Sequence, residues 1–120
     1  MKKLLLLVLM LETLQAQLPA YKDEINHLLK YVEITKCIYI RNGDKHDGKD
    51  AQKHIKRKYD YFEDDISSSE DFIRLSATQS TMFGSKYYIK CPNEEKVKSS
   101  QWLLDELERY RKSKNQTQGN

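Results

Sequence analysis

Apolar positions recur along this chain mainly at helical spacing. In the segment Ala20–Ile34 an apolar side chain returns every third or fourth residue, as it does in a helix that buries one face. The same period returns after Asp47, again at about 68–80, and in a last segment that begins at Ser99 or Ser100. The four apolar stripes are Ile25, Leu28, Leu29 and Val32; Ala51, Ile55, Tyr59 and Phe62; Phe72, Ile73 and Ala77; and Leu103, Leu107 and Tyr110, beside Trp102.

The two middle helices are each preceded by a residue that can cap them. Asp47 is followed three positions later by Asp50, and Ser67 is followed three positions later by Glu70. This is the spacing of a capping box, in which two side chains satisfy the free N–H groups at a helix start. We therefore expect Asp47 and Ser67 to begin the second and third helices.

Two further segments favour strands. Lys36–Arg41 and Tyr87–Cys91 are rich in β-branched and aromatic residues; Asn42-Gly43, a strong turn signal, ends the first, and Pro92 ends the second. The order is helix, strand, helix, helix, strand, helix. Because two strands cannot bury both faces of a sheet, the sequence predicts an α+β fold in which a two-stranded ribbon packs on about four helices.

Residues 1–16 have the pattern of an export leader. Two lysines precede the apolar run Leu4–Leu11, and a polar stretch ends at the small residue Ala16. Eight apolar residues are too few to span a bilayer core, which needs roughly 20. We expect cleavage after Ala16, a periplasmic location and no membrane anchor in the mature chain. Residues 17–112 then form a single small domain, and 113–120 form a polar, disordered tail.

The charge balance argues against a nucleic-acid partner. The whole chain has a formal net charge of +3, and removing two lysines and one glutamate with the leader leaves about +2. One face of the second helix carries Lys53, Lys56 and Arg57. A solvated helix face explains this basic stripe more simply than a binding patch does.

The mature chain has two cysteines, Cys37 and Cys91, one in each predicted strand. Export favours a disulfide between them, and antiparallel pairing of the strands would bring them close. Two buried free thiols are the alternative. A metal site on the cysteines lacks ligands, because neither has another Cys or a His within four residues.

His46 and His54 are the histidines of most interest. A shared zinc or copper ion is disfavoured because eight residues of helix rise about 12 Å, so the sequence indicates neither a metal nor a cofactor. Asp50 lies four residues before His54 on the same helical face. A carboxylate there would orient the imidazole of His54 and raise its pKa.

Several segments resemble the YfeK-like family of small periplasmic proteins of unknown function. The most specific is Arg41-Asn42-Gly43 with His46 after it and a second histidine, His54, eight residues later; the others are Ile66–Ile73 and Gly84–Ile89. The resemblance implies a leader and the same order of elements, with the cysteine pair as an accessory bridge, but no activity. It carries over these candidate site residues: Arg41, Asn42, Gly43, His46, His54, Lys58 and Glu70.

Two functions fit these residues. In the first, a non-enzymatic domain binds a small anion or an envelope protein: Arg41 and Lys58 donate to a carboxylate or phosphate, and the histidines make binding pH-dependent. The alternative is a small metal-dependent or histidine-based hydrolase that uses His46, His54 and Glu70, although so small a domain has little depth for a water-excluding pocket. If neither function applies, we expect the Arg41–His46 turn to be purely structural, with Arg41 paired to a surface acid such as Glu70.

Overall fold

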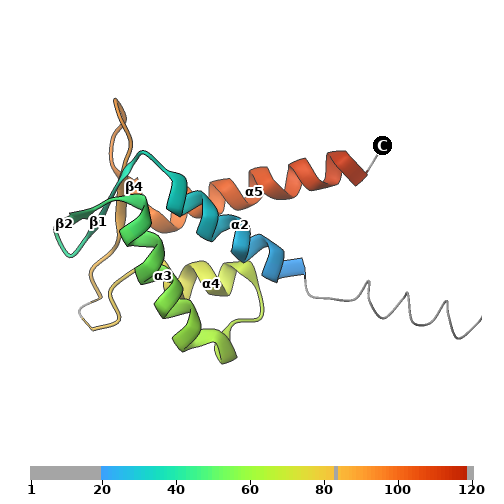
Figure 1. Ribbon diagram of the computed structural model, residues 1–120, viewed down its shortest axis with the longest axis horizontal. Coiled ribbons are helices and arrows are strands. Elements are labelled where there is room, and N and C mark those ends of the chain that lie inside the picture. Colours follow the sequence, from blue (N-terminus) through green and yellow to red (C-terminus); the bar gives the residue numbers. More distant parts are fainter. Residues whose placement is uncertain (1–19, 83, 119–120) are drawn as a thin grey trace, which may run out of the picture.

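A computed structural model describes residues 20–82 and 84–118, so the predicted leader lies outside the described residues. The labels are those of Figure 1, in which the sheet lies at one end and α5 runs beside α2. The elements are α2 (Ala20–Ile34), β1 (Ile38–Arg41), β2 (Asp44–His46), α3 (Gly48–Phe62), the 3₁₀-helix η1 (Glu63–Asp65), α4 (Ser69–Ser76), β3 (Tyr88–Lys90), β4 (Val97–Lys98) and α5 (Ser99–Gln118).

The α+β class is confirmed, but the two-stranded ribbon is wrong. The described residues form a four-stranded antiparallel sheet in the order β2-β1-β3-β4. The two predicted strands pair at its centre, with Ile38 opposite Lys90. Both edge strands escaped prediction because β2 (Asp44–His46) is polar throughout and β4 (Val97–Lys98) has only two residues. Short edge strands bury little, so they carry no apolar alternation.

The predicted turn is confirmed and closes a hairpin. Asn42 and Gly43 have φ angles of 53° and 82°, and the register pairs Arg41 with Asp44 across the turn. Two successive left-handed residues are the requirement of the two-residue hairpin turn that matches strand twist, and Asn-Gly meets it at little cost. The chain therefore returns along β1, and His46 is carried back to the start of α3.

The helix boundaries follow the predictions except in α4 and α5. Asp47 caps α3 by accepting a hydrogen bond from the Asp50 amide. Ser68, not Ser67, caps α4: its hydroxyl accepts from the Asp71 amide, and the Asp71 carboxylate accepts from the amide of Ser67. Because the carboxylate of Asp71 completes this capping box, Glu70 does not take part in it and is free to bind another partner. The helix α5 extends to Gln118, past the predicted start of a disordered tail.

The core lies between the sheet and the helices. The buried apolar residues are Ile25, Leu28, Leu29, Val32, Tyr39, Ala51, Ile55, Tyr59, Ile66, Phe72, Ile73, Ala77, Tyr87, Ile89, Leu103 and Leu107. The predicted stripes thus face inward, although Phe62, Tyr110 and Trp102 are only partly buried. The ring centroid of Trp102 lies 4.5 Å from that of Tyr31.

One close contact fixes how α3 meets α2. A Cβ atom on Gly48 would lie 2.4 Å from the carbonyl oxygen of Val32 and 2.9 Å from that of Glu33. Only glycine allows the first residue of α3 to approach the end of α2 so closely.

A disulfide joins Cys37, just before β1, to Cys91, just after β3. The predicted pairing is therefore present, and it ties together the ends of the two central strands. No helix among residues 20–82 and 84–118 is both long and apolar enough to cross a membrane.

Candidate functional site

The β1–β2 hairpin and α3 bring four of the predicted site residues to one face. Arg41 ends β1, His46 ends β2, and His54 and Lys58 occupy successive turns of α3. Arg41, His46 and Lys58 all act electrostatically on His54. The groove between the hairpin and α3 has a volume of about 480 Å³, and Arg41 and His46 line one side of it.

Tyr87 joins this group, although sequence reasoning treated it only as a strand residue. Its hydroxyl shares a hydrogen bond of 3.1 Å with Nε2 of His54. Lys58 donates from Nζ to the same hydroxyl at 3.5 Å and to the carbonyl oxygen of Gln79 at 2.6 Å. The sequence held one signal for this role, because residues two apart in a strand share a face. If Ile89 faces inward, Tyr87 does too, and a buried tyrosine hydroxyl needs a hydrogen-bond partner. We call Arg41, His46, His54, Lys58 and Tyr87 the hairpin cluster.

The surroundings of His54 favour its neutral form. Nε2 of His54 and the hydroxyl of Tyr87 share one hydrogen bond, which a neutral imidazole can make by accepting from the hydroxyl, while Lys58 donates to the oxygen of the same hydroxyl. Burial first, and then the positive charges of Arg41 and Lys58, lower the pKa of His54 to about 4.

This result corrects the predicted role of Asp50. The carboxylate was expected to raise the pKa of His54, whereas it lies 3.9 Å from Nδ1 of His46. The reason is the missed strand: β2 folds His46 back over the first turn of α3, so His46 reaches the carboxylate first. His54 therefore behaves as a neutral hydrogen-bonding group at neutral pH and not as a cation.

The cluster has unused hydrogen-bonding capacity and positive charge. Nε2 of His46 is buried and has no hydrogen-bond partner in the described part of the chain. The guanidinium of Arg41 likewise makes no hydrogen bond or ion pair to any described side chain, and its charge lowers the pKa of Lys58, after burial as the larger cause. Asp50, the carboxylate near His46, is 67% exposed at its side chain. Donors therefore outnumber acceptors on this face.

Glu70 is not part of this group. Its carboxylate accepts two hydrogen bonds from Arg111, at 2.8 and 3.1 Å. The same guanidinium donates to Glu24 at 2.8 and 3.0 Å, and Ser69 donates its hydroxyl to Glu24 at 2.6 Å. These bonds hold the pKa of both carboxyls below the usual range. The suggested pair between Arg41 and Glu70 is thus wrong: Glu70 joins α4 to α5.

Asn42 and Gly43 shape the hairpin and are exposed. They line a separate groove of about 370 Å³ with Lys86 and Lys96. Their contribution to the hairpin cluster is therefore indirect, because the turn sets where Arg41 and His46 lie. As for a metal centre, the described residues hold no group of three His, Cys, Asp or Glu side chains placed to bind one ion.

The family of this chain follows from a comparison with known protein families. Residues 19–111 match a family of unknown function, DUF5329. The chain belongs to this family. The DUF5329 match runs from the residue before α2 to Arg111, so it includes both the hairpin cluster and the Arg111 network. No curated protein and no solved structure matches the chain.

Proposed function

We propose that this protein is an exported, non-enzymatic domain that binds a small carboxylate or phosphate anion at the hairpin cluster. The observation that carries the proposal is unpaired positive charge: the guanidinium of Arg41 lines the groove beside His46 and has no acid partner among the described residues. Lys58 lies near enough to act electrostatically on the same His54. An anion placed between Arg41 and Lys58 would offset their positive charges.

Each group has a distinct part in binding. The guanidinium of Arg41 offers two parallel N–H donors, the geometry that suits a carboxylate or phosphate. His46 lines the groove beside Arg41, so its imidazole would lie against the same anion. Lys58 adds a charge, while Tyr87 and His54 hold its amine in place. An envelope protein would be recognised by the same chemistry, through an exposed carboxylate.

The periplasmic location belongs to the proposal as well. It is supported by the leader pattern of residues 1–16 and by the disulfide between Cys37 and Cys91, since disulfides persist in oxidising compartments. The likeness to the YfeK-like family is consistent with it. A hydrolase is not proposed, because Glu70, its expected third residue, lies in the Arg111 network.

The test is a titration of the mature protein with inorganic phosphate and with acetate, followed by NMR or calorimetry. Arg41→Ala should lower affinity at least tenfold, since a charge-assisted hydrogen bond contributes about 1.5–3 kcal/mol. Arg109→Ala is the matched control, because Arg109 is an exposed arginine of α5 that pairs with Glu106. Absence of binding to wild type, or equal losses in both variants, would refute the site.

A further inference from the structure

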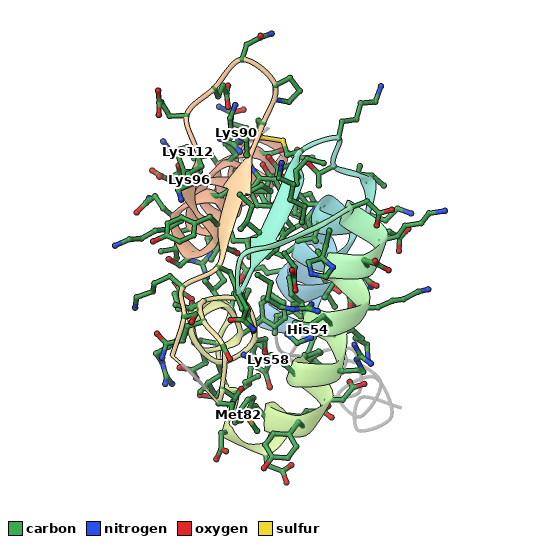
Figure 2. All side chains as sticks on the ribbon, turned by 90° about the vertical axis from the view of Figure 1, so that its left-hand side faces the viewer. His54, Lys58, Met82, Lys90, Lys96 and Lys112 are labelled. Atoms are coloured by element: carbon green, nitrogen blue, oxygen red, sulfur yellow. A yellow bond between two sulfur atoms is a disulfide. The ribbon has the colours of Figure 1, made fainter. Side chains whose placement is uncertain are left out.

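A second groove continues the hairpin cluster along α3. It has a volume of about 400 Å³ and is lined by His54, Arg57, Lys58, Tyr61, Phe62 and Thr81. His54 and Lys58 belong to the hairpin cluster, and Arg57 also lines the first groove. In the view of Figure 2, Lys58 lies between His54 and Met82.

The far end of this groove is apolar. The rings of Tyr61 and Phe62 pack edge to face with their centroids 4.8 Å apart. Tyr61 is 81% exposed, and Met82, in the loop beyond Thr81, is 83% exposed. The lining at this end therefore offers two rings against which an apolar group could pack. The two grooves share Arg57, and together their lining changes from cationic at Arg41 to apolar at Tyr61.

We infer that the anion bound by this protein is amphiphilic, with a carboxylate or phosphate head and one alkyl or aryl tail. The inference rests on the proposed function, because the head occupies the hairpin cluster. The tail lies along α3 over Phe62 and Tyr61. His54, Lys58 and Phe62 are spaced by four residues, so they share one helical face that extends about 12 Å from first to last.

The charges around the apolar end favour a single molecule over a membrane surface. Three exposed acids, Glu63, Asp64 and Asp65, follow Phe62 directly in η1. An anionic lipid surface wide enough to cover Tyr61 would meet these carboxylates and be repelled. A single tail in the groove leaves them in water, while its head remains at the cationic end.

The experiment compares acetate, hexanoate and decanoate at concentrations below micelle formation, with calorimetry or NMR as the readout. Affinity should rise at least tenfold from acetate to decanoate, because the groove removes part of the tail from water. In Tyr61→Ser this gain should shrink while acetate binds as before. Leu104→Ser is the matched control, an exposed apolar residue on α5, and should change nothing.

The outcomes separate this inference from the proposed function. Equal affinity for the three acids, with Arg41→Ala weakening all of them, overturns the amphiphile and leaves a plain anion site. Equal binding of decanol and decanoate removes the role assigned to the head and overturns the inference. Binding to phosphatidylglycerol vesicles without binding to dissolved decanoate also overturns it, because the partner would then be a membrane. Failure of inorganic phosphate and of every acid to bind refutes the proposed function itself.

Discussion

The neutral state of His54 makes a definite contribution to how folding stability depends on pH. In the folded protein its pKa is about 4, against 6.5 for an exposed histidine. On acidification the unfolded chain therefore takes up a proton at this position before the folded chain does. The stabilising contribution is complete above pH about 6.5, and it is lost progressively as the pH falls through about 4.

The magnitude follows from the difference between the two pKa values. At about 1.36 kcal/mol for each pKa unit, it has an upper limit of about 3 kcal/mol. His54 is only partly buried, and solvent screens the charges of Arg41 and Lys58, so about 1–2 kcal/mol is expected. The charged groups that contribute to lowering its pKa are Arg41, Lys58, Arg57 and His46.

The assay is urea unfolding of wild type and His54→Gln at several values between pH 7 and pH 4. The glutamine amide can keep a hydrogen bond to Tyr87 and does not titrate. Carboxyls such as Glu24 and Glu70 titrate in both proteins, so their effects cancel in the difference. Wild type should lose about 1–2 kcal/mol more than the variant over this range. Parallel stability curves would show that His54 is not held neutral by its surroundings.

Two other predictions concern stability. Gly48→Ala should destabilise the protein by about 1–3 kcal/mol or more, because its Cβ would meet the Val32 carbonyl. Gly43→Ala has open space around its Cβ and should cost less, about 1–2 kcal/mol, for its left-handed backbone alone. Thermal unfolding that shows Gly43→Ala to be the less stable variant would contradict the close contact at Gly48. Protein purified without reductant after expression in an oxidising compartment should show no free thiol at Cys37 or Cys91. Reduction should lower the free energy of unfolding by about 4 kcal/mol for the 54-residue separation. Two labelled thiols in each chain would refute the bridge.

Local patterns identified most of the helices and strands and several residues of the site, but not the partners of those residues. The period of apolar residues in Ala20–Ile34 and the cap at Asp47 are properties of neighbouring residues, and the structure confirms both. The Asn42-Gly43 dipeptide likewise predicted the tight turn that the structure shows. The strand β2, by contrast, is polar and exists because β1 offers it free hydrogen-bonding groups, a condition that no local pattern records.

The sequence by itself determined the α+β class, the inward faces of the helices and the tight turn, because each depends on spacing along the chain. It favoured a bridge between Cys37 and Cys91 but left two free thiols open, and the structure decided for the bridge. The tertiary structure alone decided which side chains meet. It carried His46 back to Asp50, placed Tyr87 between His54 and Lys58, and took Glu70 to Arg111. These partners are 4, 33, 29 and 41 residues apart. The distant contacts depend on how helices and strands pack, and helical spacing alone did not show that the carboxylate of Asp50 would serve His46 instead of His54.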